Sequence, residues 1–352
     1  MEILVLPGDG IGPEISAATI AVLEAVNKRF ALDLTFHRED IGFASLEKCG
    51  STLPGSVLEA ARRSDGVILG PGSHLDYPPR EQGGINASGE IRKVLDLYAN
   101  IRPSRSRKGL SFAGKEMDLV IVRENTEGFY SDRNMVAGSG EFMPTEDLAL
   151  SVRKISAFAS NRIARTAFEL AATRRRKVTA VHKANVLHLT EGLFLREVRK
   201  VAKEFPGVAL EEIIVDAMAA HLIRNPARFD VIVTTNMFGD ILSDEAAELS
   251  GSLGLAASLN AGSDFGVAQA QHGSAPDIAG QDRANPTSLI LSAAMLLEWL
   301  GSRRRNAALH KAAKSIDAAV DAALASASTR TADLGGSIGT RAFADAVIAF
   351  LP

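Results

Sequence analysis

Residues 229–244 read Phe-Asp-Val-Ile-Val-Thr-Thr-Asn-Met-Phe-Gly-Asp-Ile-Leu-Ser-Asp and join an apolar run to a helical pattern. The run Asp230–Thr235 is rich in β-branched residues and lacks polar alternation, which predicts a strand covered on both faces. A short turn then leads into a helix predicted over Ser243–Leu253. The i, i+4 spacing of Asp240 and Asp244 places both carboxylates on one helix face. The stretch therefore predicts a strand, a turn and a helix, with two acids near the carboxyl end of the strand.

The same alternation of short apolar runs and longer helical patterns extends along the chain. The other predicted strands are Glu2–Leu6, Gly66–Leu69, Asp118–Val122, Val178–Val181 and Glu212–Val215. The other predicted helices are Glu14–Phe30, Ser151–Thr173, Leu193–Phe205, Pro286–Leu300, Asn306–Ala325 and Thr340–Phe350. The string Pro144-Thr145-Glu146-Asp147 also predicts a helix start. Alternation of this kind predicts an α/β protein with a largely parallel central sheet.

Length and composition narrow the class of protein. A chain of 352 residues predicts two domains, and its net charge of −3 gives no basic excess for nucleic acid or an anionic membrane. The single cysteine, Cys49, excludes an intramolecular disulfide framework. No apolar run reaches the roughly 18 residues of a membrane span, and the N-terminal run is too short for a signal peptide. A cytoplasmic enzyme is therefore expected.

A third acid, Asp216, directly follows another predicted strand. Ligands bind at the carboxyl ends of strands in open α/β sheets, so Asp216, Asp240 and Asp244 are candidate metal ligands. Carboxylate oxygens suit Mg²⁺ or Mn²⁺. The alternative for each acid is helix capping or a solvated position at a helix start.

Basic and phenolic residues near other strand ends are the remaining candidates. Arg92, Arg102 and Arg123 stand in apolar or aromatic surroundings, and guanidinium groups bind carboxylates bidentately. Lys183 follows the strand Val178–Val181, where a nearby metal could lower its pKa and make it a base. Tyr130 could donate a phenolic proton. Taken singly, each arginine could instead form a surface salt bridge, and Lys183 and Tyr130 could each have a structural role.

The string Gly335-Gly336-Ser337-Ile338-Gly339 fits the nucleophile elbow of serine hydrolases. That elbow needs a preceding strand, and Thr331–Leu334 is a poor one, so a hydrolase is disfavoured. Gly8-Asp9-Gly10-Ile11-Gly12 lacks the spacing of a dinucleotide fingerprint and predicts only a tight strand-to-helix turn.

Taken together, these strings resemble the isocitrate/isopropylmalate dehydrogenase family of metal-dependent β-decarboxylating dehydrogenases, which also includes homoisocitrate, tartrate and D-malate dehydrogenases. The resemblance spans essentially the whole chain. Its segments are Leu6–Glu14, Asp96–Pro103, Val122–Tyr130, His182–Asn185, Phe229–Asn236, Gly239–Asp244, His272–Gly280 and Ala284–Pro286.

The resemblance implies a two-domain isopropylmalate dehydrogenase-like fold with the active site in the interdomain cleft. A large, cofactor-binding domain would comprise 1–97 plus 243–352. A small domain, 98–242, would make the dimer, hold substrate and metal, and carry an arm near 131–148. The resemblance further implies a homodimer, with a higher oligomer possible, in which the active sites are shared. Lys183 and Asp216 would come from the partner subunit, and the first subunit would contribute Arg92, Arg102, Arg123, Tyr130, Asp240 and Asp244.

The implied reaction is oxidative decarboxylation of a malate-type 2-hydroxy acid with NAD. Lys183 would accept the proton of the C2 hydroxyl, and Tyr130 would help to protonate C3 after CO₂ leaves. The segment implied to bind the cofactor contains His272, Gly273, Ser274, Ala275, Asp277, Ile278 and Asn285. Asp277 stands where an acid would bind the adenosine ribose and repel a 2′-phosphate, which favours NAD over NADP. Gln269 replaces a glutamate of relatives near this segment.

The substrate's C3 substituent depends on the loop before Arg92. Asn86 and Ser88 stand six and four residues before that arginine and could hydrogen-bond a polar substituent, which favours tartrate, D-malate or an isocitrate-like acid. Glu90 argues against a third carboxylate unless it turns outward. The alternative is a 3-isopropylmalate dehydrogenase of leucine biosynthesis, because Pro79–Gly83 is similar to that subgroup. A remote alternative, a non-catalytic regulatory subunit, is disfavoured because the chain keeps the lysine, the tyrosine and all three aspartates.

Overall fold

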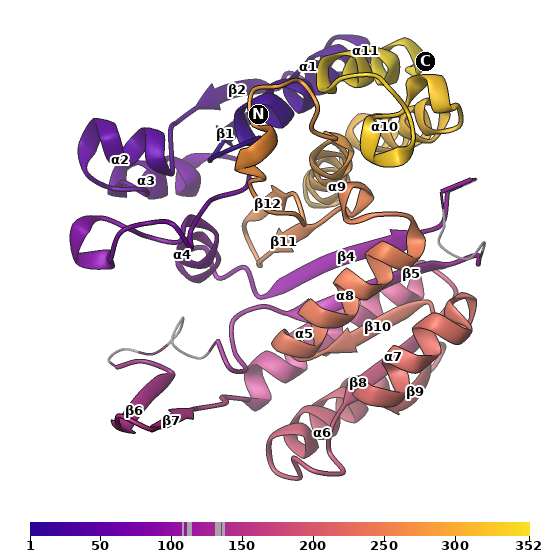
Figure 1. Ribbon diagram of the computed structural model, residues 1–352. Coiled ribbons are helices and arrows are strands. Elements are labelled where there is room, and N and C mark those ends of the chain that lie inside the picture. The colour runs from indigo at the N-terminus through magenta and orange to yellow at the C-terminus, as the bar shows by residue number, and fades with distance from the viewer. Residues whose placement is uncertain (108, 111–114, 131–134, 136–137) are drawn as a thin grey trace. The chain divides into compact units, whose positions relative to one another are not determined.

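The computed structural model describes residues 1–107, 109–110, 115–130, 135 and 138–352. The chain divides into two compact units (Figure 1). The first unit comprises Met1–Leu95, Arg107–Leu110 and Ser252–Pro352, and the second comprises Asp96–Ser106 and Ser111–Gly251. The predicted domain boundary at 242/243 falls inside one continuous helix, α8 (Asn236–Ser250), and the second unit ends after that helix.

The first unit is built on five strands in the order β2-β1-β3-β12-β11. Their bounds are β1 (Glu2–Leu6), β2 (Thr35–Arg38), β3 (Gly66–Leu69), β11 (Leu259–Ala261) and β12 (Gly266–Gln269). Neighbours are parallel except β11 and β12. Its helices are α1 (Gly12–Phe30), α2 (Phe43–Cys49), α3 (Gly55–Arg63), α4 (Ala87–Val94), α9 (Thr287–Arg304), α10 (Ala307–Leu324) and α11 (Thr340–Phe350). Helix α9 packs against β12 and β3 (Figure 1).

In the described part of the second unit, the main sheet has five strands in the order β4-β5-β10-β8-β9, and within it only the β4–β5 pair is antiparallel. Their bounds are β4 (Ala99–Arg105), β5 (Asp118–Glu124), β8 (Lys177–His182), β9 (Ala209–Ile214) and β10 (Val231–Thr234). Helices α5 (Ala157–Ala172) and α6 (Thr190–Ala202) cover one face of this sheet, and α7 (Val215–Arg224) and α8 cover the other.

The β5 strand shows why these runs lack polar alternation. Val120 and Val122 pack with residues of α5 and α6, whereas Leu119 and Ile121 pack with residues of α7 and α8. Both faces are buried, so each position from Leu119 to Val122 is apolar. The structure thus confirms the α/β class and the largely parallel strands predicted from the sequence.

Three local predictions are wrong. The helix start at Thr145 is instead the end of β6 (Glu141–Thr145), which pairs antiparallel with β7 (Leu148–Ser151). The Thr145 hydroxyl donates to the Asp147 carboxylate at 2.6 Å, so these polar residues close a hairpin rather than cap a helix. The predicted helix from Ser151 begins only at α5, where the Ser156 hydroxyl accepts the Ala159 N–H at 3.1 Å.

The third error concerns residues 229–244. The turn predicted between the strand and the helix is instead the first turn of α8, which begins at Asn236. Asp216, predicted to follow a strand that ends at Val215, likewise lies in the first turn of α7.

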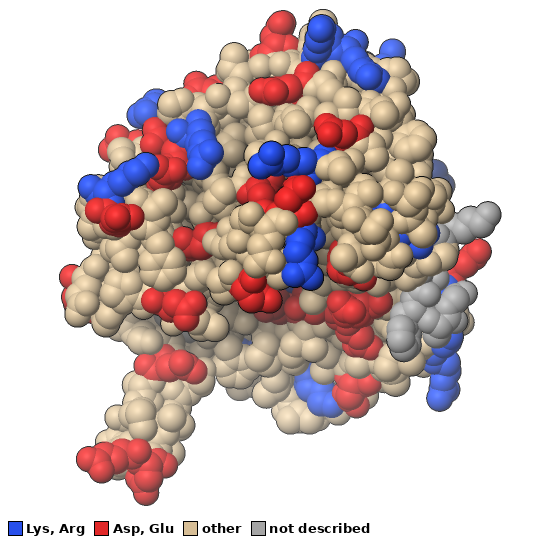
Figure 2. Space-filling view, turned by 45° about the horizontal axis from the view of Figure 1, so that its top comes forward, with Lys and Arg blue, Asp and Glu red and all other residues tan. Residues whose placement is uncertain are grey.

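The hairpin of β6 and β7 contains residues 141–148 of the arm predicted near 131–148, and residues 131–134 and 136–137 lie outside the described part of the chain. Its large apolar side chains are exposed: Phe142, Met143, Leu148 and Leu150. Figure 2 shows the hairpin protruding from the surface of the second unit, with acidic side chains at its end. Among the described residues, no helix combines the length and apolar character needed to cross a membrane.

Candidate active site

Strand β5 and helix α8 together position the first group of candidate residues. Arg123 lies near the end of β5, in register with Thr234 at the end of β10. The chain then turns into α8, whose first turn packs directly on the stem of Arg123. A Cβ on Gly239 would lie 2.6 Å from Cγ and 2.7 Å from Cβ of Arg123, so only glycine permits this approach.

Arg123 is buried, with 2% of its surface exposed, and it organises the first turns of α8. Its Nε and Nη2 donate to Asn236 Oδ1 at 3.0 and 2.7 Å, and its Nη1 donates to the Asp240 carboxylate. The Tyr130 hydroxyl donates to the other oxygen of Asp240 at 3.4 Å. The phenol and the guanidinium thus share one carboxylate.

Arg102, from β4, reaches the same carboxylate. Its Nη1 donates to Asp240 Oδ1 at 3.2 Å, to Ser243 Oγ at 2.7 Å and to Asp244 Oδ1 at 3.3 Å. Burial, followed by repulsion from Arg123, lowers the pKa of Arg102 to about 10, while the two aspartates oppose that shift. Arg102 therefore remains a cation at neutral pH.

The α8 carboxylates meet the chemical requirements of a divalent metal. Asp240 and Asp244 both contact the same nitrogen of Arg102, so their oxygens converge on one side of the helix. Their side chains are 37% and 51% exposed, and carboxylate oxygens are the ligands that Mg²⁺ and Mn²⁺ prefer. No set of three His, Cys, Asp or Glu side chains suited to a metal occurs in the described part of one chain. The predicted third ligand, Asp216, does not complete such a set within its own chain.

Asp216 instead pairs with Lys183, which follows β8. The Lys183 ammonium donates to the Asp216 carboxylate, and this bond lowers the pKa of Asp216. The side chains of Lys183 and Asp216 are 27% and 60% exposed. The two residues that the resemblance assigns to a partner's site therefore lie together at the surface of the second unit.

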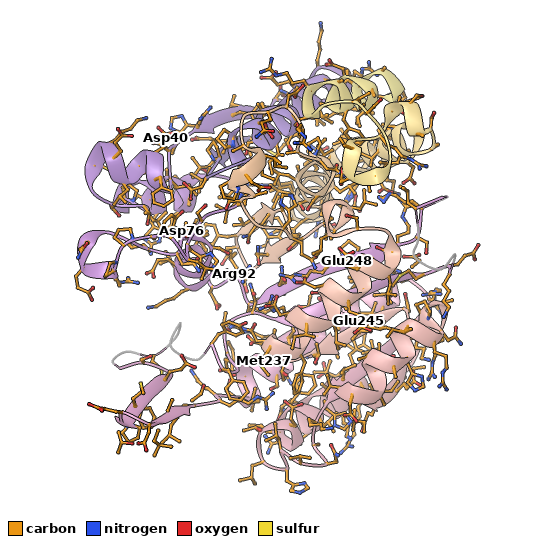
Figure 3. The ribbon with its side chains drawn as sticks, in the orientation of Figure 1. Asp40, Asp76, Arg92, Met237, Glu245 and Glu248 are labelled. Atoms are coloured by element: carbon orange, nitrogen blue, oxygen red, sulfur yellow. The ribbon has the colours of Figure 1, made fainter. Side chains whose placement is uncertain are left out.

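In the first unit, Arg92 and Ser88 on α4 share an acceptor (Figure 3 labels Arg92). Gln269 Oε1 accepts from Arg92 Nη2 at 3.2 Å, from Ser88 Oγ at 3.1 Å and from Asn260 Nδ2 at 3.1 Å. Asn86 caps α4, because its Oδ1 accepts the Gly89 N–H at 3.2 Å. The sequence singled out Gln269 only as a substitution near the cofactor segment, because its bond to Arg92 spans 177 residues.

The predicted cofactor segment, from His272 to Asn285, is tied to the turn that follows β1. The Ser274 carbonyl accepts the Ile11 N–H at 2.8 Å, and the hydroxyls of Ser73 and Ser274 lie 2.7 Å apart. Burial lowers the pKa of His272, which favours a neutral imidazole. The Asn285 side chain donates to Asp333 at 3.0 Å.

Comparisons with known proteins identify the family. The model of the family described as isocitrate/isopropylmalate dehydrogenase matches residues 2–347. The chain belongs to the isocitrate/isopropylmalate dehydrogenase family.

Individual relatives cover this dehydrogenase almost completely. An isocitrate/homoisocitrate dehydrogenase of Thermus thermophilus is 44% identical, with 99% of this chain and 97% of the relative aligned. A 3-isopropylmalate dehydrogenase of Archaeoglobus fulgidus is 41% identical, with 99% of each chain aligned. The crystal structure of an isocitrate dehydrogenase from Methylococcus capsulatus is 39% identical and superposes with a TM-score of 0.88 over 99% of each chain. These findings make the protein an oxidoreductase, a decarboxylating dehydrogenase of a 3-substituted malate, in a family that implies a divalent metal and a nicotinamide cofactor.

The structure groups most of the predicted site residues of this dehydrogenase. It brings Arg102, Arg123, Tyr130, Asp240 and Asp244 together, joins Lys183 to Asp216, and links Arg92 to Ser88 through Gln269. Sequence reasoning missed Asn236 and Ser243, which hold the two arginines on α8. Both lie in the quoted stretch, where a helix starting at Asn236 would have placed them on the face that bears Asp240.

Proposed function

We propose that this enzyme carries out the NAD-dependent oxidative decarboxylation of a malate with a small or polar 3-substituent, such as tartrate, D-malate or isocitrate. The pairing of two buried arginines with the convergent Asp240 and Asp244 carboxylates carries the proposal. Asp240 and Asp244 would hold Mg²⁺ or Mn²⁺, with Asp216 of a second copy as third ligand. When bound, such an ion acidifies a coordinated hydroxyl and stabilises negative charge that develops on oxygen.

The arginines would bind the substrate's carboxylates. Arg102 and Arg123 are buried and charged, so a carboxylate that reaches them forms strong, charge-assisted hydrogen bonds. Arg92 would bind a further carboxylate, held in place by its bond to Gln269. All the candidate acids share a dicarboxylate core. Binding this core would explain why the site has three arginines.

Lys183 and Tyr130 would move the protons. Lys183 would accept the proton of the C2 hydroxyl, and a bound NAD would supply the acceptor for the hydride of C2. The C3–carboxylate bond would then break and CO₂ would leave. The electron pair of that bond would form an enolate, which would take a proton at C3 from the Tyr130 hydroxyl. The proton held by Lys183 replaces that of Tyr130, so the balance is hydroxy acid plus NAD⁺ to keto acid, CO₂ and NADH.

Two observations support a polar C3 substituent. Ser88 donates to Gln269, which leaves its oxygen as an acceptor for a ligand, and Asn86 uses its oxygen as a cap, which leaves its amide nitrogen as a donor. Glu90 pairs with Arg80 at 3.4 Å, so the charge of this acid is balanced within the chain. The alternative, a 3-isopropylmalate dehydrogenase of leucine biosynthesis, is favoured by the similarity to the Archaeoglobus fulgidus 3-isopropylmalate dehydrogenase. The Thermus thermophilus relative is named for isocitrate and homoisocitrate.

Asp277 supports NAD over NADP, because a carboxylate beside the adenosine ribose repels a 2′-phosphate. His272, Gly273, Ser274, Ala275, Ile278 and Asn285 would complete the cofactor site. We further propose a cytoplasmic homodimer, possibly assembled into a higher oligomer, whose domains are 1–97 plus 243–352 and 98–242. The exposed apolar residues of the hairpin, such as Phe142 and Met143, support its role as a dimer arm.

A panel of substrates tests the proposal. The kcat/KM is measured for tartrate, D-malate, isocitrate, homoisocitrate and isopropylmalate, with NAD and with NADP, in the presence of Mn²⁺. The proposal expects a polar or small substrate with NAD to give the highest value. A much higher kcat/KM for isopropylmalate than for every polar acid would overturn the substrate assignment. Equal or better use of NADP would overturn the cofactor assignment.

A further inference from the structure

Glu191, in the first turn of α6, is a fully buried carboxylate that none of the roles above uses. Its Oε2 accepts the backbone N–H of Lys183 at 2.9 Å. The Lys183 carbonyl in turn accepts the N–H groups of Val186 and Leu187 at 3.0 and 2.9 Å. The backbone of the lysine is therefore held from both sides, and among the described residues the Glu191 side chain is the acceptor of its N–H.

The other oxygen of Glu191 lies in a buried ion pair. It accepts from Arg153 Nη2 and, at 3.4 Å, from the Thr235 hydroxyl. Arg153 also donates to Thr190 at 3.0 Å and to Thr235 at 3.1 Å, and only 8% of its side chain is exposed. Thr235 is the residue that precedes α8. One carboxylate thus connects the Lys183 loop to the start of the helix that bears Asp240 and Asp244.

Stability alone is a weak reason for this arrangement. Desolvation of two charges offsets most of their attraction, and well-packed apolar side chains of similar volume often serve a buried site equally well. What an apolar pair could not do is accept the Lys183 N–H. The bond from Arg153 gives the Glu191 carboxylate a defined orientation.

We propose that Glu191 is a positioning residue that holds the backbone of Lys183, with Arg153 orienting Glu191, so that the lysine amine meets the C2 hydroxyl in reach of proton transfer. The inference rests on the proposed role of Lys183 as proton acceptor. A misplaced proton acceptor slows the chemical step and leaves substrate binding nearly intact, so the effect belongs in kcat.

Two doubly substituted enzymes distinguish a positioning role of Glu191 from a role in packing alone. Both replace Arg153 with methionine, which removes the buried charge, and they differ only at position 191. Glu191→Met cannot accept the Lys183 N–H, whereas Glu191→Gln can, and no arginine remains to compete for its oxygen. We expect kcat to fall about tenfold or more in the Met/Met enzyme and to recover to within about threefold of the parent in the Gln/Met enzyme, with KM little changed in both.

An exposed ion pair of the same unit supplies the control. Arg165 and Glu204 lie 2.7 Å apart with side chains 41% and 48% exposed, and replacing both with methionine should leave kcat unchanged. Equal kcat in the Met/Met and Gln/Met enzymes would overturn the proposal. Lys183→Ala is measured in parallel. If that variant keeps the parent kcat, Lys183 is not the proton acceptor, and this result does not depend on what Glu191 does.

Amide hydrogen exchange of the unmodified enzyme provides a measurement that needs no variant to fold. Lys183 lies in a loop, where an amide with no partner exchanges rapidly. Bonded to a fully buried carboxylate, its N–H should instead be protected about as strongly as those of the neighbouring strand β8. Rapid exchange of the Lys183 amide would contradict the proposal.

Discussion

The α8 cluster (Arg102, Arg123, Tyr130, Asp240 and Asp244) and the Lys183–Asp216 pair are both candidate parts of the active site, but they are built differently. In the α8 cluster, two buried guanidiniums hold the carboxylates through bonds from β4 and β5. In the pair, one ammonium contacts one carboxylate that is mostly exposed. The cluster is organised by its own chain, whereas the side chains of the pair meet solvent.

This difference fits a division of labour between subunits. Groups that bind carboxylates and metal gain from preorganisation, because fixed donors need not reorganise when charge develops. A partly exposed lysine and a mostly exposed aspartate become a defined site only when another surface covers them. The following predictions test whether the cluster and the pair differ in this way.

Loss of the metal ligands should have the largest effect. Asp240→Asn keeps the shape of the side chain but removes the charge that would bind a divalent ion, so kcat/KM should fall by about 100-fold or more. Excess EDTA should abolish turnover of the parent, and Mn²⁺ should restore it. Glu248→Gln, one helical turn beyond Asp244 (Figure 3), is the matched control and should retain parental activity. Full turnover in EDTA would rule out the metal role.

Mixing two inactive enzymes tests whether the pair serves a second subunit. Lys183→Ala and Asp240→Asn chains are each expected to be inactive, but a mixed dimer would contain one site with both groups intact. Random exchange should restore about a quarter of the parental activity. Exchange is checked by native mass spectrometry, and mixed dimers without activity would contradict shared sites.

Stability should respond to the cluster and not to the pair. Arg123→Met removes a buried cation that satisfies Asn236 and Asp240, so the free energy of unfolding should fall by about 2–3 kcal/mol. Lys183→Met should leave the free energy of unfolding unchanged within error, because exposed ion pairs contribute little. Urea denaturation monitored by circular dichroism measures both. An equal loss of unfolding free energy in the two variants would contradict the difference between the α8 cluster and the Lys183–Asp216 pair.

Ser243→Ala should have the smallest effect. It removes one hydrogen bond to Arg102, at 2.7 Å, while the two aspartates continue to hold the guanidinium. We expect KM for the hydroxy acid to rise about threefold with kcat unchanged, since the bonds to the two carboxylates keep the guanidinium in place. A large fall in kcat would show that Ser243 acts in the chemical step.

Strands and helices with a continuous burial signal were predicted well. The bounds of β1, β3 and α11 match the predictions to the residue, because each position in β1 and β3 after Glu2 is buried. Strand β2 was missed because its Thr-Phe-His-Arg sequence is mostly exposed. Strand β4 was missed because two arginines and a proline interrupt its apolar pattern.

By itself, the sequence determined the α/β class, the family and the residue types near the strand ends, because these leave local patterns in the chain. Only the tertiary structure decided which of those residues meet. Asp240 contacts Arg123 across 117 residues and Arg102 across 138, and Gln269 links Arg92 to Ser88. Glu191 lies only eight residues from Lys183, yet its ion pair with Arg153 depends on burial that no spacing records. Hydrogen bonds depend on distances between atoms, and strand pairing and helix packing set those distances.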